Sequence, residues 1–202
     1  MKSTNQEHKT KKFTLVSKKQ VLTLFVVVLS ALNLNAQTIV SGVKVDDKLS
    51  LEGKDLTLNG AGIREKLWMD LYVGSLYVTK KTTSGQEIVD SKDAVAIKLN
   101  ITSGMITSSK MINAVNEGFE KSTNKNTAPL KTKIDKFKSF FNDKINKGDV
   151  FVIMYNGNES VVYKNGTKKG SVEGYEFKKA VIGIWLGKTV VDEDLKAGML
   201  GK

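Results

Sequence analysis

A single arginine, Arg64, is the residue of this sequence best suited to binding an oxygen anion. It is the only guanidinium among the 32 basic residues of a 202-residue chain. A guanidinium is planar, always charged and donates hydrogen bonds in a fork, which a lysine ammonium does not do. Two interpretations of Arg64 are open at this point: a residue that grips an anionic ligand, or an ordinary surface or ion-pair residue in a lysine-rich chain.

The composition excludes several kinds of active site. The only histidine, His8, lies near the amino terminus, and the chain has no cysteine. The remainder therefore cannot form a Ser-His-Asp or Cys-His site, and it lacks the preferred ligands of zinc. We expect no metal and no cofactor, so any catalysis would rest on Arg, Lys, Tyr, Ser, Thr, Asn or carboxylate side chains.

Residues 1–36 have the pattern of a secretory signal peptide. Six lysines precede the apolar run 21–29, and a small residue, Ala36, follows at a suitable cleavage position. The run is short for a membrane span. We expect cleavage after Ala36, a mature domain over 37–202 without a stable membrane span, and a periplasmic or secreted location. The alternative is an uncleaved amino-terminal anchor.

Much of the apparent basicity belongs to that segment. Its removal takes away six lysines and one glutamate, which lowers the formal net charge from +11 to +6 and leaves 166 residues. This length suits one domain. The remaining lysines are not interleaved with aromatic residues as in nucleic-acid-binding surfaces, so we expect no nucleic-acid partner. The sequence leaves the oligomeric state open.

The hydrophobic periodicity predicts an α+β domain with a large antiparallel sheet of six or seven strands and helices on one side. Expected strands cover 39–45, 49–58, 67–78 and 93–102, followed by a three-stranded meander with Asn-Gly turns over 149–172. One expected helix starts from a cap at Thr107 or Ser108 and ends near the polar linker 121–124. Further helices are expected in a stretch from Pro129 to Ile145, at 175–186 and at 192–200. Around Trp68, the residues that would point to either face of the sheet are apolar, so we expect a strand buried on both faces with Trp68 in the core.

Gly60, Ala61 and Gly62 are expected to form a corner between two strands. The glycines permit positive φ angles or the close approach of another backbone or a ligand. The third glycine and the following helix of a dinucleotide-binding motif are missing, so a phosphate cradle is not expected.

Four segments in this order resemble the chalcone isomerase-like family, and in particular its bacterial secreted branch. They are 58–64 (Leu-Asn-Gly-Ala-Gly-Ile-Arg), 71–78 (Leu-Tyr-Val-Gly-Ser-Leu-Tyr-Val), 147–149 (Lys-Gly-Asp) and 184–187 (Ile-Trp-Leu-Gly). The resemblance covers essentially the whole chain after residue 36. It implies an open-faced β-sandwich, in which helices cover one face of the sheet and a ligand cleft lies between the two layers.

The resemblance also implies a choice between two functions. Plant members cyclise chalcone to flavanone, whereas fatty-acid-binding relatives hold an acyl chain with an arginine on its carboxylate, and that arginine matches Arg64. The resemblance places four polar active-site positions of the plant enzymes on or near Tyr72, Ile106, Asn113 and Ile184. At two of them, 106 and 184, this sequence has an isoleucine, which has no polar group. The replacement favours burial of hydrocarbon over cyclisation.

We therefore expect a non-catalytic protein that binds a fatty acid or similar apolar carboxylate. Arg64 would hold the carboxylate, Tyr72 and Asn113 would form hydrogen bonds, and the apolar wall would comprise Ile106, Ile184 and Trp185. One alternative is an isomerase (intramolecular lyase) that acts on an unsaturated carbonyl compound, with Arg64 polarising the oxygen and Tyr72 assisting. Another is a scaffold protein whose cleft is filled by its own side chains.

Overall fold

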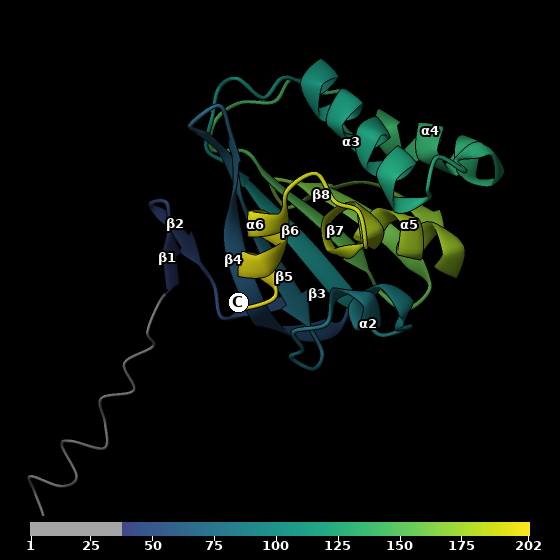
Figure 1. Cartoon of the computed structure of the whole chain (residues 1–202), viewed down its shortest axis with the longest axis horizontal. Coiled ribbons are helices and arrows are strands. Elements are labelled where there is room, and N and C mark those ends of the chain that lie inside the picture. The colour runs from purple at the N-terminus through teal and green to yellow at the C-terminus, as the bar shows by residue number, and fades with distance from the viewer. Residues whose placement is uncertain (1–37) are drawn as a thin grey trace, which may run out of the picture. The chain divides into compact units, whose positions relative to one another are not determined.

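Seven strands form one antiparallel sheet in which neighbours in the sheet are also neighbours in the sequence (Figure 1). The structure, a computed structural model, describes residues 38–202, so the predicted signal peptide lies outside the described residues. The sheet comprises β3 (Lys48–Leu51), β4 (Lys54–Lys66), β5 (Met69–Val78), β6 (Val95–Ile101), β7 (Val150–Tyr155), β8 (Glu159–Lys164) and β9 (Thr167–Glu173).

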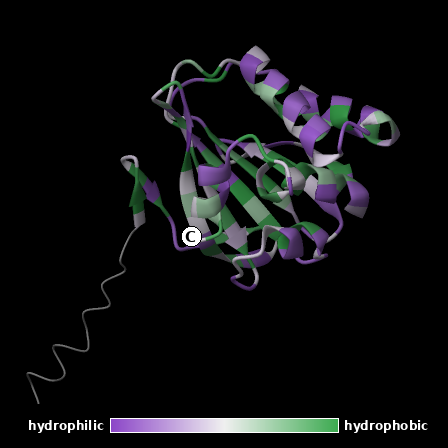
Figure 2. Cartoon of the chain, viewed as in Figure 1, coloured by the Kyte–Doolittle hydropathy of each residue, from purple (hydrophilic) through white to green (hydrophobic). Residues whose placement is uncertain are grey.

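The helices share a single hydrophobic core with one face of this sheet. They are α2 (Gly85–Asp90), α3 (Ser108–Ser122), α4 (Lys131–Ser139), which follows a 3-10 turn at Ala128–Leu130, α5 (Tyr175–Leu186) and α6 (Glu193–Met199). The alternate apolar residues of β6, from Val95 to Ile101, all lie in this core, as their spacing predicts. Figure 2 shows hydrophobic residues along the strands and hydrophilic residues on the outer helices. The predicted α+β class is confirmed.

A second, smaller core lies on the other face of the sheet. It contains alternate residues of β5, including Val73 and Tyr77, and it is joined by Val45 from a separate two-stranded sheet, β1 (Thr38–Val40) and β2 (Val43–Val45). Strand β5 is thus covered on both faces, as its continuous apolar run predicts.

Several local predictions were wrong. The strands expected at 39–45 and 49–58 are each broken by a turn, at 41–42 and at 52–53, where the φ angles are positive. Gly60 to Gly62 do not form a corner but lie inside the long strand β4. The run predicted as a strand from residue 67 begins at Met69, because Leu67 and Trp68 form the turn between β4 and β5, and Trp68 is 90% exposed. The helix expected to reach Ile145 ends at Ser139, although Ile145 is buried.

The glycines of β4 give helix α6 a place to lie against the sheet. A Cβ on Gly60 would stand 2.3 Å from the carbonyl oxygen of Gly198, and one on Gly62 would stand 2.9 Å from that of Leu195. Across the strand pair, a Cβ on Gly74 would meet the side chain of Met199 at 2.4 Å. We call Gly60, Gly62 and Gly74 the glycine platform. At Gly60 and Gly62 the neighbours are backbone atoms, so only a residue without a Cβ allows α6 to approach this closely.

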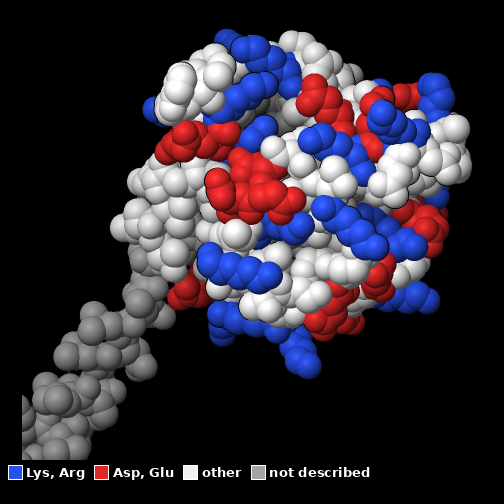
Figure 3. Space-filling view, viewed as in Figure 1, with Lys and Arg blue, Asp and Glu red and all other residues white. Residues whose placement is uncertain are grey.

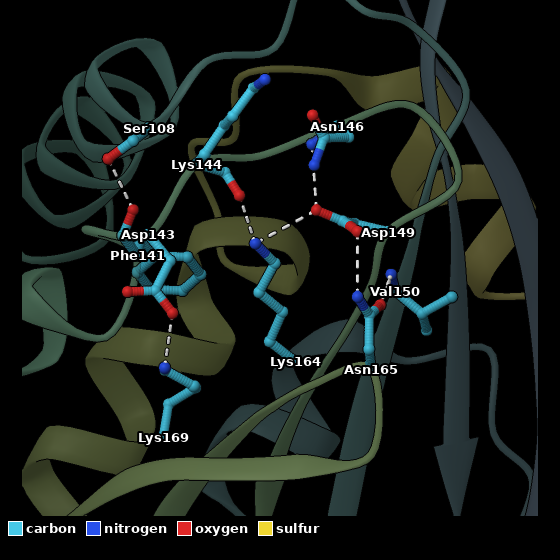
Figure 4. Close-up of polar contacts among 10 residues, drawn as sticks. All are labelled: Ser108, Phe141, Asp143, Lys144, Asn146, Asp149, Val150, Lys164, Asn165 and Lys169. Atoms are coloured by element: carbon cyan, nitrogen blue, oxygen red, sulfur yellow. Dashed lines mark hydrogen bonds and ion pairs between the residues drawn. The ribbon is translucent and has the colours of Figure 1, made fainter.

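The Lys-Gly-Asp segment before β7 ties the α4–β7 loop to the turn between β8 and β9 (Figure 4). Gly148 has a φ of 93°, which favours glycine. Asp149 accepts hydrogen bonds from Asn165 Nδ2 and from the amide of Asn146, both at 2.9 Å, and its carboxylate lies 3.1 Å from Lys164 Nζ. Burial raises the pKa of Asp149, but these donors together outweigh burial and lower the pKa below its ordinary value.

Replacement of Gly60 by alanine is expected to destabilise the protein by about 2 kcal/mol or more, since the new methyl group meets backbone atoms of α6 that cannot turn aside. Urea denaturation measures the change in the free energy of unfolding. Gly104→Ala is the matched control, because nothing lies within 4 Å of a Cβ there, and it should change stability by less than about 1 kcal/mol. Equal effects of the two substitutions would contradict the close approach of α6.

The lowered pKa of Asp149 predicts a loss of stability in acid. The unfolded chain takes up a proton near the ordinary aspartate pKa of about 4, whereas the folded protein does so only at lower pH, so stability falls as the pH drops through this range. Asp149→Asn should be less stable at neutral pH and should lose less stability on acidification. Denaturant titrations at a series of pH values measure both effects, and parallel pH profiles would contradict the prediction.

Candidate functional site

A cavity of about 440 Å³ lies between the sheet and helices α3 and α5. Its volume falls in the range of roughly 300–1,000 Å³ that is usual for small-molecule sites. Strands β4, β5 and β6 form one wall, and α3, α5 and the loops beside them form the other. Most of its lining is apolar: Leu67, Met69, Leu71, Leu99, Met105, Ile106, Met111, Ala114, Val115, Ile184, Trp185 and Val191.

Arg64 and Tyr72 lie side by side in this cavity because they are cross-strand partners in β4 and β5. Trp185 of α5 donates a hydrogen bond from Nε1 to the Tyr72 hydroxyl at 3.1 Å. Burial raises the pKa of Tyr72 to about 12, despite the opposing effects of the Trp185 hydrogen bond and the Arg64 charge. The phenol is therefore neutral at physiological pH, and its proton is available to an acceptor in the cavity.

Arg64 is held by a carboxylate of the protein itself. Its Nη1 lies 2.8 Å from Oδ2 of Asp192, and it also donates to the carbonyl of Glu65 at 3.1 Å. The other oxygen of Asp192 caps helix α6 by accepting from the amide of Leu195 at 2.8 Å. Both side chains of the pair are largely buried, with exposed fractions of 20% for Arg64 and 10% for Asp192. The pair fixes the guanidinium at the polar end of the cavity and offsets the cost of burying its charge.

The ion pair leaves part of the guanidinium free. Both bonds that Arg64 makes within residues 38–202 use Nη1, so Nη2 and Nε donate to no acceptor in that part of the protein. A planar guanidinium has five N–H donors, enough to serve a second carboxylate beside the first. The arrangement can thus bind an anion, although Asp192 competes with it electrostatically.

All six residues predicted for the site line this cavity: Arg64, Tyr72, Ile106, Asn113, Ile184 and Trp185. Ile106, Ile184 and Trp185 are buried and form apolar wall. Asn113 differs from the others, because it lies on an exposed position of α3 and so belongs to the rim rather than the interior. The structure brings the predicted residues together, and their roles toward a ligand stay a prediction.

Sequence reasoning missed the counter-ion and the charged part of the rim. The acidic residues at 192–194 were expected only to start a helix, and Asp192 does cap α6, but its contact with Arg64 joins residues 128 positions apart. Lys66, Lys110 and Glu117 also line the cavity. No local signal distinguishes these residues from other charged surface positions, so only the tertiary structure identifies them.

Residues 38–202 contain neither a cluster of metal ligands nor a membrane-spanning helix. No group of three or more His, Cys, Asp or Glu side chains there is placed to hold a metal ion. None of the helices in the same range has the length and apolar character needed to cross a membrane.

Comparison with known proteins agrees with this geometry. The sequence model of a family described as chalcone isomerase-like matches residues 37–201. A crystal structure of a fatty-acid binding protein from Arabidopsis thaliana superposes with a TM-score of 0.61, over 81% of this chain and 95% of that one. Sequence identity to it is only 17%, so this likeness establishes the fold alone. No curated protein sequence matches significantly.

Proposed function

This chain belongs to the chalcone isomerase-like family, and from that premise we propose that it binds a fatty acid or a similar apolar carboxylate without transforming it. The observation that carries the proposal is an apolar cavity of about 440 Å³ with one fixed cation at its polar end. Burial of hydrocarbon there is favourable by roughly 25 cal/mol per Å². The structural neighbour from Arabidopsis thaliana is a fatty-acid binding protein, which supports the same ligand class.

The polar end of the cavity offers two kinds of donor to a carboxylate. Arg64 supplies charged N–H groups, and the neutral phenol of Tyr72 beside it supplies an O–H. Charge-assisted hydrogen bonds of this type are about twice as strong as neutral ones. The acyl chain would then run along the apolar wall formed by Ile106, Ile184 and Trp185.

The ion pair with Asp192 gives this proposal a sharp test. On delipidated protein, Arg64→Ala is expected to weaken palmitate binding by about tenfold or more, because it removes charged hydrogen bonds to the carboxylate. Asp192→Asn should instead strengthen palmitate binding, since asparagine still caps α6 but no longer competes for the guanidinium. Isothermal titration calorimetry measures both affinities.

Hexadecanol is the control ligand, because it has the same chain as palmitate but no charge. Its affinity should hardly respond to either substitution. Failure to bind palmitate saturably, or equal palmitate affinities of the natural protein and Arg64→Ala, would contradict the proposed function. Turnover of a chalcone that depends on Arg64 would favour the isomerase alternative.

We also propose that the ligand is bound outside the cytoplasm, in the periplasm or after secretion. The support is the signal-peptide pattern of residues 1–36. Amino-terminal sequencing of the protein recovered from its host should find a chain that begins at Gln37. A chain that retains the apolar run 21–29 would contradict cleavage and favour the anchor.

A further inference from the structure

Four exposed apolar side chains gather at one end of the domain. Leu67, Trp68 and Met69, at the turn between β4 and β5, are 69%, 90% and 37% exposed, and Met105, in the loop between β6 and α3, is 44% exposed. Figure 1 shows the β4–β5 turn and this loop at the same end of the sheet. We call these four residues the apolar rim.

The apolar rim lies beside the cavity. Leu67, Met69 and Met105 all line it, whereas Trp68 projects from the turn and does not. The two segments are joined through Leu71, whose carbonyl accepts from the amides of Thr102 and Ser103 at 3.0 and 3.2 Å. The exposed patch is therefore a fixed part of the site's entrance, not an isolated surface residue.

The backbone holds Trp68 in solvent at an energetic cost. Lys66 pairs with Met69, so Leu67 and Trp68 form a two-residue turn, with left-handed φ angles of 51° and 63°. Each bulky residue costs about 1 kcal/mol or more in this conformation. Turns of this kind favour Asn-Gly, which the protein itself uses at Asn165 and Gly166. The Trp68 side chain is 90% exposed, so its burial within the fold does not offset the cost of this backbone conformation. A costly conformation that keeps an indole in solvent indicates a binding role.

The charges beside the rim indicate the kind of partner. Lys66 and Lys110 line the same opening, and in Figure 3 uncharged atoms project beside basic side chains at this end of the domain. Tryptophan prefers the interface between membrane and water, and lysines near an anionic lipid surface gain about 1 kcal/mol each. Acidic residues, Glu65 and Glu117, are exposed nearby, so the attraction to an anionic surface has to come from Lys66 and Lys110 themselves.

We propose that the apolar rim docks onto an anionic lipid surface, so that an acyl ligand passes between the bilayer and the cavity without crossing water. The inference rests on the proposed function for its ligand. A bilayer is favoured over a protein partner because three of the four exposed residues line the cavity itself and lysines lie beside them, and an amphipathic carboxylate of this class resides in membranes.

Quenching of tryptophan fluorescence by vesicles of brominated phosphatidylcholine and phosphatidylglycerol tests this docking on the protein as its host produces it. We expect strong quenching in the natural protein and little in Trp68→Phe, because the other tryptophan, Trp185, is buried. Trp68→Ser should weaken co-sedimentation with the vesicles by about tenfold or more. Ile39→Ser is the matched control, since Ile39 is 69% exposed on β1 and does not line the cavity.

A second arm tests the charge. Lys66→Gln should weaken binding to the anionic vesicles by about fivefold, and it should have little effect on vesicles of phosphatidylcholine alone. Equal effects on the two kinds of vesicle would overturn the anionic character of the partner.

Palmitate affinity in vesicle-free buffer separates this inference from the proposed function. Trp68→Ser should leave that affinity unchanged, because Trp68 does not line the cavity. Palmitate binding without quenching of Trp68 would overturn docking and leave the proposed function intact. Quenching of Trp68 without palmitate binding would support docking and overturn the proposed function. A change of oligomeric state in Trp68→Ser, with unaltered vesicle binding, would overturn docking and assign the rim to a second copy of the chain.

Discussion

The contact between helix α6 and the glycine platform is the constraint on which the site depends. Because Gly60 and Gly62 lack side chains, the backbone of α6 lies directly against β4. That position brings the amino-terminal end of the helix to Arg64, where Asp192 both caps α6 and pairs with the guanidinium. The orientation of the only arginine therefore follows from main-chain packing several residues away, and not from the strand that carries it.

Most of the fold could be predicted from the sequence, because its elements are locally encoded. The alternation along β6, the helical spacing of α3 and the Asn-Gly turn at 165–166 each determine their own segment. The glycines of β4 were misread as a corner, since their reason is a helix more than 130 positions later in the chain. Trp68 was misplaced in the core because an unbroken apolar run conceals a turn made by two large residues.

The candidate site was predicted less completely than the fold, and the omissions have one physical cause. Family resemblance indicated five of the six predicted positions, and all six line one cavity. It did not indicate that Arg64 is already paired, because an ion pair depends on side-chain positions in space rather than on spacing in the sequence. Scarcity of arginine allowed two interpretations, an anion clamp and an ion-pair residue. The geometry is consistent with both, since Arg64 lines the cavity and its guanidinium is paired through Nη1, while Nη2 and Nε donate to no acceptor within residues 38–202.

The order of elements along the chain has a consequence for how the protein is made. Strand β4 leaves the ribosome early, whereas α6, which covers its glycines and supplies the counter-ion of Arg64, follows every strand of the sheet. Wherever the chain folds, a sheet that forms before α6 has docked keeps bare glycine backbone and an unpaired guanidinium exposed. The binding site is thus completed only after every strand of the sheet and α6 are present together, and until then the chain is open to factors that hold unfolded polypeptides.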